Sequence, residues 1–202
     1  MSDKLGKLFV ISGPSGTGKG TICAELLKDR CNEFSVSMTT RAPRVGEEEG
    51  VHYYFVTKEE FQANIDKGNF LEHAVVFDNM YGTPKDAVLK KLERGRNVIL
   101  DIDVQGGLQV KKAMPEAVMI FILPPSMEVL RERLVGRKTD AEDVIEKRLG
   151  EAINEIKLIG EYDYYIVNDD LEQAVREAKC IIEAESCRVP EHVKSIISKY
   201  DK

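Results

Sequence analysis

The sequence contains no tryptophan and only four cysteines, and no hydrophobic run approaches the roughly 20 residues of a membrane span. None of the cysteines has a nearby histidine at a spacing typical of zinc sites. We therefore expect free thiols, a reducing cytoplasmic location and no membrane partner. The N-terminus has neither the apolar stretch nor the cleavage site of a secretory signal, so we expect none. The cysteines are Cys23, Cys31, Cys180 and Cys187.

The chain also lacks an excess of positive charge. There are 29 Lys and Arg residues against 35 Asp and Glu residues, which gives a net charge of -6. This balance does not favour DNA or RNA, so we expect no nucleic-acid partner and only local binding of phosphate groups. With 202 residues, the chain has the size of one domain that carries smaller insertions.

Short apolar runs alternate with helical patterns along most of the chain. Runs such as "NVILDIDV" are apolar almost throughout, which is typical of parallel strands covered on both faces. Strands that alternate with helices predict an α/β fold with a central parallel sheet. The expected strands are 7–12, 97–104, 117–125 and 162–170, and the expected helices are 21–30, 126–134, 141–160 and 171–185.

Two segments interrupt this alternation. Residues 35–90 combine short alternating patterns with a helix expected at 58–70 and a hairpin expected at 71–84, which predicts an insertion with its own small sheet. Residues 137–157 are expected to form a second, mobile excursion made of a basic and acidic helix pair. The core is then expected to comprise 1–34, 91–136 and 158–202, and to end in a short amphipathic helix.

A glycine-rich stretch, "GPSGTGKG", lies between the first expected strand and the first expected helix. Gly13, Gly16 and Gly18 allow a tight turn whose N–H groups face an anion at a helix N-terminus. Lys19 then reaches the β and γ phosphates of a nucleotide. The alternative is a glycine-rich turn that binds nothing, which we disfavour because glycines, lysine and the strand-to-helix context agree.

The stretch departs from the usual phosphate-loop pattern at its last residue. That pattern has Ser or Thr after the lysine as a Mg²⁺ ligand, whereas this sequence has Gly20 and then Thr21. A hydroxyl shifted by one residue points elsewhere around the helix. We therefore expect Mg²⁺ to be held mainly by phosphates and water, near Asp101 and Thr21.

Two arginines follow in the segment "TTRAPRVGEEEGVHYYF". Arg41 and Arg44 are close enough to grip one phosphate group, and Tyr53 and Tyr81 can add phenolic donors. On spacing alone, a solvated turn with core aromatic residues is an equally good interpretation.

Acidic and basic residues in the second half of the chain extend this pattern. Asp101 and Asp103 are two apart at the end of a predicted buried strand, and both are expected at the carboxyl edge of the sheet, where ligands bind in α/β folds. "DVQG" also fits a GTPase motif, but "IVNDD" lacks the matching guanine motif, so we take the fit as coincidence.

Arg133, Arg137 and Arg148 flank the 137–157 excursion, where they are either solvated charges or part of a lid. The apolar stripe of the excursion is Ile145, Leu149, Ala152, Ile156 and Ile159.

Taken in order, these segments resemble the guanylate kinase family, whose members phosphorylate GMP with ATP. The long arginine-to-tyrosine segment is the specific one, whereas the glycine-rich loop is shared with many nucleotide-binding families. The resemblance covers residues 8 to about 185. The matching segments are "GPSGTGKG", "TTRAPRVGEEEGVHYYF", "FLEHAVV", "YGT", "ILDIDVQG", "PPS", "RLVGR", "KRL" and "IVNDD".

The resemblance implies a P-loop three-layer α/β fold in a single domain, in which 35–90 is a small mixed β region that binds GMP and 137–157 is a helical lid. It implies that Glu72 pairs with guanine, helped by Asp103. The implied GMP-binding residues are Ser37, Arg41, Arg44, Tyr53, Glu72, Tyr81, Thr83, Asp101 and Asp103. The implied ATP-binding residues are Gly13, Pro14, Ser15, Gly16, Thr17, Gly18, Lys19, Gly20, Thr21, Arg133, Arg137, Asn168 and Asp169, and the implied catalytic residues are Lys19, Arg44, Arg137 and Arg148.

The implied reaction transfers the γ-phosphoryl group of ATP to GMP, with Mg²⁺ as cofactor and dGMP as a further expected acceptor. A monomer and a dimer both remain open. One alternative is a catalytically silent guanylate-kinase-like module that binds phosphopeptides, and another is a kinase for AMP or dTMP. We favour the GMP kinase because Lys19, the arginines and the acidic pair are all present.

Overall fold

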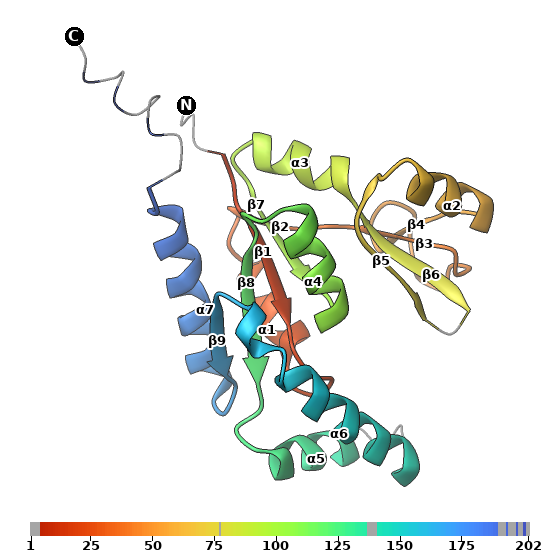
Figure 1. Cartoon of the computed structure of the whole chain (residues 1–202), viewed down its shortest axis with the longest axis vertical. Coiled ribbons are helices and arrows are strands. Elements are labelled where there is room, and N and C mark those ends of the chain that lie inside the picture. Colours follow the sequence, from red (N-terminus) through yellow and green to blue (C-terminus); the bar gives the residue numbers. More distant parts are fainter. Residues whose placement is uncertain are drawn as a thin grey trace.

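A computed structural model describes residues 5–76, 78–136, 141–189, 193, 197 and 200. Its centre is a five-stranded sheet in the order β2-β7-β1-β8-β9, and every neighbouring pair is parallel. The carboxyl ends of the strands therefore share one edge, at the bottom of Figure 1. The strands are β1 (Leu8–Ser12), β2 (Asn32–Phe34), β7 (Asn97–Asp101), β8 (Val118–Leu123) and β9 (Tyr164–Val167).

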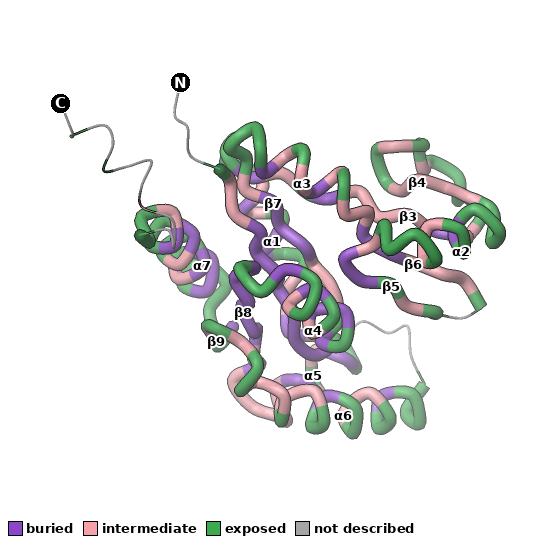
Figure 2. The backbone as a smooth tube through the Cα atoms, turned by 45° about the horizontal axis from the view of Figure 1, so that its top comes forward, coloured by how far each residue is buried: buried purple, intermediate pink, exposed green. Residues whose placement is uncertain are grey.

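Helices cover both faces of this sheet. On one face, α1 (Lys19–Leu26) and α7 (Leu171–Ser186) bury a cluster that includes Phe9, Ile22 and Ala178. On the other, α3 (Lys85–Glu93) and α4 (Val104–Ala113) bury a cluster that includes Val10 and Val110. The three central strands, β1, β7 and β8, are the most buried elements of the chain (Figure 2). The predicted three-layer α/β fold with a parallel sheet is confirmed.

A second, mixed sheet of four strands lies beside the first (Figure 1). Its order is β4-β3-β6-β5, with one parallel and two antiparallel pairs. It is covered by α2 (Lys58–Asp66), whose Phe61 is fully buried and stacks on Phe70 at a ring distance of 4.6 Å. The strands are β3 (Ser37–Thr39), β4 (Tyr53–Phe55), β5 (Phe70–Val76) and β6 (Asn79–Pro84).

A pair of helices lies below the carboxyl edge of the central sheet (Figure 1). They are α5 (Met127–Gly136) and α6 (Glu142–Ile156), and a short 3-10 helix, η1 (Ile159–Glu161), leads back to β9. Their contact is a small apolar cluster of Leu130, Leu134, Ile145 and Ala152. Within the described part of the expected excursion, 141–157, lies α6, whose helical character agrees with the apolar stripe, whereas α5 ends before residue 137.

Several expected elements differ from those observed. The strand expected at 97–104 ends at Asp101, because the Asp103 side chain accepts a hydrogen bond from Gly106 N at 2.7 Å and caps the start of α4. Asp103 therefore lies on the cap of α4 and not on the strand that holds Asp101. The helix expected at 21–30 begins and ends earlier, at Lys19 and Leu26, and the sequence analysis missed β2, α3 and α4 altogether.

Other expectations concern thiols, membranes and the C-terminus. All four cysteines are free thiols, as expected. No helix within the described residues is long and apolar enough to cross a bilayer. The helix expected at the C-terminus lies mostly outside the described residues, although Ile197 N donates to Val193 O at 3.0 Å.

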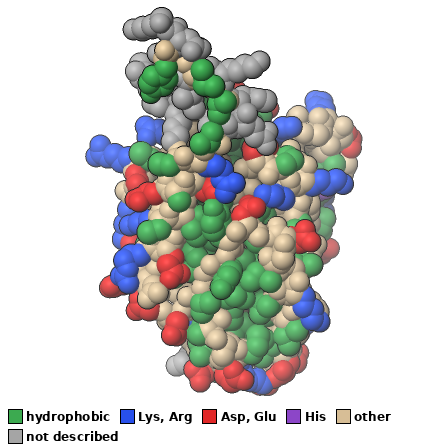
Figure 3. Space-filling model, turned by 60° about the vertical axis from the view of Figure 1, so that its left-hand side comes forward, with side chains coloured by type: hydrophobic (Ala, Val, Ile, Leu, Met, Phe, Trp, Pro, Cys, Tyr) green, Lys and Arg blue, Asp and Glu red, His purple; other side chains and the backbone are tan. Residues whose placement is uncertain are grey.

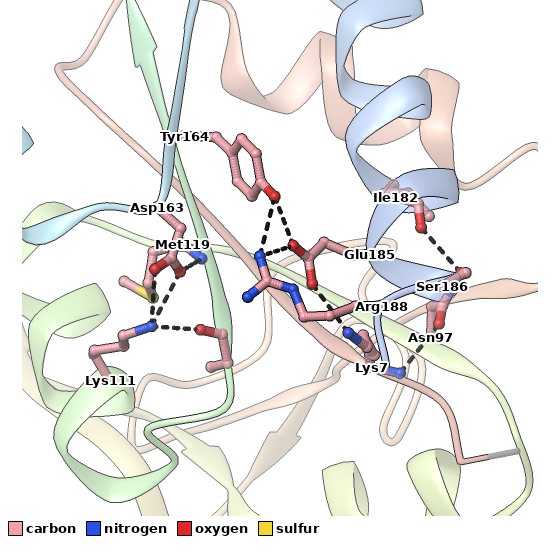
Figure 4. A network of polar contacts seen from close by, with 11 residues as sticks. Lys7, Asn97, Lys111, Met119, Asp163, Tyr164, Ile182, Glu185, Ser186 and Arg188 are labelled. Atoms are coloured by element: carbon pink, nitrogen blue, oxygen red, sulfur yellow. Dashed lines mark hydrogen bonds and ion pairs between the residues drawn. The ribbon is translucent and has the colours of Figure 1, made fainter. Parts of the chain in front are cut away.

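A polar network holds the end of α7 against β1 and β9 (Figure 4). The Glu185 carboxylate is almost fully buried and accepts hydrogen bonds from Lys7 Nζ at 3.0 Å, Tyr164 Oη at 2.6 Å and Arg188 Nη2 at 2.6 Å. Burial opposes ionisation of Glu185, but these donors outweigh it and keep its pKa below the usual value. The chain therefore leaves α7 from a fixed point beside β9.

Candidate active site at the carboxyl edge of the sheet

The glycine-rich loop follows β1 directly and leads into α1. Gly13, Gly16 and Gly18 have φ angles of 140°, 96° and 89°, which are rarely adopted by residues with a side chain. A Cβ atom at Gly13 would lie 2.3 Å from Ile122 O of β8, and one at Gly18 would lie 2.4 Å from the Asn168 side-chain nitrogen. The loop path is therefore possible only with glycine at these positions.

Lys19 begins α1 and folds back over the loop. Its ammonium group donates to the backbone oxygens of Gly13 at 2.5 Å and Pro14 at 3.0 Å. The Asp101 carboxylate lies near it at the end of β7. Burial raises the pKa of Asp101, and the positive charge of Lys19 partly offsets this effect.

The surroundings of Asp101 fit a metal ion that keeps most of its own water. A Cβ atom at Gly20 would lie 3.5 Å from Asp101 Oδ2, so the position after Lys19 faces this carboxylate. Thr21 is exposed, and its hydroxyl makes no hydrogen bond within the described part of the chain. No group of three or more metal-ligating side chains occurs among the described residues. One carboxylate beside a phosphate loop suits Mg²⁺, which commonly uses one or two carboxylates together with phosphates and water.

Asn168, after β9, ties the loop to the far side of the site. Its side-chain nitrogen donates to Thr17 O at 2.7 Å, and its backbone oxygen accepts from Arg133 Nη2 at 2.8 Å. The residue is buried, whereas the neighbouring Asp169 is exposed. The side-chain amide of Asn168 is thus engaged within the protein and positions the loop.

The helices below the sheet bring cations to the same loop. Arg148 of α6 places Nη1 3.5 Å from Ser15 Oγ of the loop, although the two residues are far apart in sequence. Glu155, also on α6, faces Lys19 and Asp103, and burial raises its pKa despite the positive charge of Lys19. Arg137 lies outside the described residues.

The predicted arginine pair lies in the turn between β3 and β4. Arg41 places its guanidinium 5.5 Å from the ring centre of Tyr53, and the ring of Tyr53 meets that of Tyr81 edge-on at 6.0 Å. The structure therefore brings Arg41, Tyr53 and Tyr81 together.

Glu47 organises this turn, and the sequence analysis did not single it out. One carboxylate oxygen accepts from Arg41 Nη2 at 2.8 Å, and the other accepts from the backbone N–H of Arg44 at 2.7 Å. The hydrogen bond from Arg41 is the main reason that the pKa of Glu47 falls to about 2. The run "GEEEG" contains three adjacent glutamates, and nothing in the sequence shows which of them turns inward.

Glu72 and Thr83 form a buried polar pair between β5 and β6. Thr83 Oγ1 donates to Glu72 Oε1 at 2.6 Å, and the two residues are directly paired across the strands. Burial raises the pKa of Glu72, as does the nearby Asp103, while the Thr83 hydrogen bond opposes the shift. Ser37, the remaining predicted residue of this region, begins the nearby strand β3.

Tyr162 is another residue that sequence reasoning missed. It lies beside Ser12 at the end of β1, where a Cβ atom at Gly107 would lie 2.7 Å from its hydroxyl. Its ring packs edge-on against Phe121 at 4.9 Å. Burial raises the pKa of Tyr162 to about 12, so the phenol stays protonated. In the sequence it is one of three tyrosines in "YDYY", with no signal that separates it from the others.

A glycine-rich loop that holds a lysine at the carboxyl edge of a parallel sheet defines a P-loop nucleotide-binding protein. A family model for guanylate kinase matches residues 5–185. The chain belongs to the guanylate kinase family, as the sequence resemblance predicted.

Individual relatives agree with the family model. Guanylate kinase from Clostridioides difficile (strain 630) is 51% identical over 98% of this chain and 97% of its own length. The enzyme of the same name from Caldanaerobacter subterraneus subsp. tengcongensis is 52% identical over 92% of this chain and 91% of its own. A crystal structure of guanylate kinase from Anaplasma phagocytophilum aligns with a TM-score of 0.72 at 38% identity, covering 92% of this chain and 89% of the other.

The loop geometry predicts that Gly18→Ala destabilises the protein. The substitution adds a side chain at a φ of 89° and places it against the Asn168 nitrogen. We expect a loss of about 2 kcal/mol or more in the free energy of unfolding, measured by urea denaturation. Gly150→Ala on exposed α6, where nothing lies within 4 Å, should be neutral or stabilising. Equal effects of the two substitutions would contradict the account of the loop.

Proposed function

We propose that the chain transfers the γ-phosphoryl group of ATP to GMP, giving ADP and GDP, with dGMP as a further acceptor. The observation that carries the proposal is the short connection after β7. Asp101 lies beside Lys19 of the phosphate loop, and Asp103, two residues later, lies beside the buried Glu72. A phosphate site and a site for a polar base edge thus face each other across the end of one strand.

Glu72 supplies the recognition of guanine. Guanine presents two neighbouring donors, N1–H and the N2 amino group, which an ionised carboxylate accepts together. Thr83 orients this carboxylate from one side, and Ser37 and Asp103 complete the pocket. Adenine has no donor at N1, so its binding would leave a buried charge poorly paired.

The phosphates are held by cations from separate segments. Arg41, Arg44, Tyr53 and Tyr81 bind the phosphate of GMP, and Glu47 is a positioning residue that holds both arginines. The loop from Gly13 to Thr21 binds the phosphates of ATP, with Lys19 near the transferred group. The lid arginines Arg133, Arg137 and Arg148 and the segment Asn168–Asp169 complete the ATP side.

The transfer itself requires alignment and charge neutralisation more than proton transfer. An oxygen of the GMP phosphate is already anionic near neutral pH, so no general base is needed to attack the γ-phosphorus in line. Mg²⁺, near Asp101, neutralises phosphate charge when it is bound. Lys19, Arg44, Arg137 and Arg148 stabilise the charge on the transferring group. Residues 137–157 act as a lid and residues 35–90 as a GMP-binding region, which together exclude water when both substrates are bound.

The remaining features fit a soluble enzyme of nucleotide metabolism. We propose a cytoplasmic location, in which the reduced thiols persist. The core comprises 1–34, 91–136 and 158–202, and both a monomer and a dimer are compatible with the site. A silent phosphopeptide-binding module would have no use for Lys19 folded over an intact loop, so catalysis is favoured.

The experiment that tests this function is a coupled assay of ADP formation from ATP. GMP, dGMP, AMP, dTMP and a no-acceptor control are compared with Mg²⁺ present. We expect turnover with GMP and dGMP and a much lower rate with AMP or dTMP. Binding of GMP without ADP formation would support the silent module instead, and high turnover with AMP would overturn the assignment of Glu72.

Lys19→Ala separates binding from chemistry. Lys19 donates to the phosphate loop, whereas the proposed GMP-binding arginines lie in a separate turn, so GMP binding measured by calorimetry should survive with less than a threefold change in Kd. The rate of phosphoryl transfer should fall by about 10³-fold, since a cation aimed at the transferring group is lost. Lys28→Ala, on an exposed side chain that pairs with Glu25, serves as the control. Equal loss of GMP binding and turnover would contradict this role.

The raised pKa of Glu72 predicts an acid limb in GMP recognition. The pKa is raised, so the carboxylate becomes protonated, and loses an acceptor oxygen, at a higher pH than an ordinary glutamate. We expect kcat/KM for GMP to fall as the pH is lowered through this pKa. Glu72→Gln should lower kcat/KM at neutral pH by about 10²-fold and flatten this limb, leaving only the titration of the GMP phosphate. An unchanged limb in the variant would exclude Glu72 as its source.

Glu47→Gln tests the positioning of the arginines. The amide can still accept from Arg44 N–H, but it loses the ion pair with Arg41, so we expect KM for GMP to rise about tenfold with a smaller change in kcat. Inhibition by guanosine, which has no phosphate, should be unchanged. Glu48→Gln is the matched control, because within the described chain that side chain forms no hydrogen bond or ion pair with either arginine. Equal weakening of GMP binding and of guanosine inhibition would indicate that the whole GMP-binding region is disturbed, and would contradict a role through the arginines.

A further inference from the structure

The outer edge of the central sheet carries an apolar surface that no described part of the chain covers. Figure 3 shows hydrophobic side chains gathered on the side of the molecule where α7 and β9 lie. Tyr165 and Val167 of the edge strand β9 are 64% and 41% exposed, and Leu171 is 39% exposed. An edge strand of this kind is usually paired or covered, because its open backbone and apolar side chains favour association.

A shallow groove of about 530 Å³ runs along this edge, between β9 and α7. On the helix side, the residues that line it recur at helical spacing, from Gln173 through Glu177 to Cys180 and Ile181. A groove lined along one helix face by residues at this spacing fits a second helix laid alongside. We propose that the C-terminal segment of the same chain, residues 190–202, folds back as a helix into this groove.

The sequence of the segment matches such a position. Val193, Ile196, Ile197 and Tyr200 are spaced i, i+3, i+4 and i+7, which places them on one face of a helix. An α-helical hydrogen bond joins Ile197 N to Val193 O at 3.0 Å, and a turn-type hydrogen bond joins Tyr200 N to Ile197 O at 2.8 Å. Ile197 and Tyr200 are 51% and 83% exposed in the structure, so their apolar surface is available for packing.

The geometry of the connection also fits. Arg188 is held by Glu185 and Tyr164 (Figure 4), so the segment starts beside β9 at the end of α7. A helix of about 13 residues is about 20 Å long, which matches the distance along α7 back to Gln173. In an antiparallel helix pair whose connecting turn is centred between Arg188 and Val189, Ile197 lies opposite Cys180 and Ile196 lies opposite Ile181.

The charges at the far end of the groove are complementary to those of the segment. Arg176 and Glu177 line the groove. The same antiparallel arrangement places Asp201 opposite Arg176 and Lys199 near Glu177. Opposite charges on the two helices favour this register over a shifted one, although each exposed pair contributes only about 0.2–1 kcal/mol.

Reactivity of Cys180 toward a thiol reagent tests the proposal. Cys31→Ser and Cys187→Ser remove the other exposed thiols, and Cys23 is buried, with a pKa raised to about 12. In this background, ending the chain at Val189 should accelerate labelling of Cys180 about tenfold, as expected if the segment occupies the groove about 90% of the time.

A pair of adjacent substitutions provides the matched control. Ile197→Asp should accelerate labelling nearly as much as the truncation, whereas Ser198→Asp, on the opposite side of the predicted helix, should leave it unchanged. Equal labelling of the full and truncated chains would overturn the proposal. Protection that appears only at high protein concentration, together with a dimeric mass in light scattering, would also overturn it and identify a second copy as the occupant. Labelling requires no catalysis, so this test does not depend on the proposed reaction.

Discussion

The close approach of the phosphate loop to strand β8 is the constraint on which the site depends. A side chain at Gly13 would meet Ile122 O at 2.3 Å, and three glycines of the loop adopt positive φ. Only this path aims the loop carbonyls at Lys19 and opens the N-terminus of α1 toward the carboxyl edge of the sheet. Because Asn168 braces the same loop and Arg133 donates to Asn168 O, the segment after β9 and helix α5 are positioned by it as well.

The second constraint is charge. The protein carries a net charge of -6, yet the proposed reaction brings two phosphate chains together. Burial raises the pKa of Asp101, Glu72 and Glu155, so the site contains carboxylates that are costly to keep ionised. Lys19 lies near Asp101, Arg148 of α6 reaches Ser15 of the loop, and the β3–β4 turn carries two further arginines around Glu47. In this account, the cations of the protein compensate the negative phosphates of the substrates, and the donors of the guanine base pair with the buried carboxylate.

The sequence predicted the layers of the fold and the family, because apolar runs and the glycine-rich loop are local signals. It did not predict α4, since two adjacent glycines obscure the helix, nor the end of β7 at Asp101, which the cap at Asp103 determines. The sequence analysis assigned Asn168 no structural role beyond the implied ATP binding, because its side-chain hydrogen bond to Thr17 O is a contact across most of the chain. Tyr162 was missed because its role arises from tertiary contacts, and Glu47 because nothing in the sequence separates it from Glu48 and Glu49.

The central claim is that the phosphate loop and the Glu72 pocket face each other across the end of β7. Calorimetric titration with a molecule that joins adenosine and guanosine through five phosphates tests this claim most directly. The account predicts binding at least 10²-fold tighter than either ATP or GMP alone, because one linker spans both sites. It also predicts that Lys19→Ala and Glu72→Gln each weaken this binding. Affinity no better than that of ATP, or insensitivity to Glu72→Gln, would contradict it.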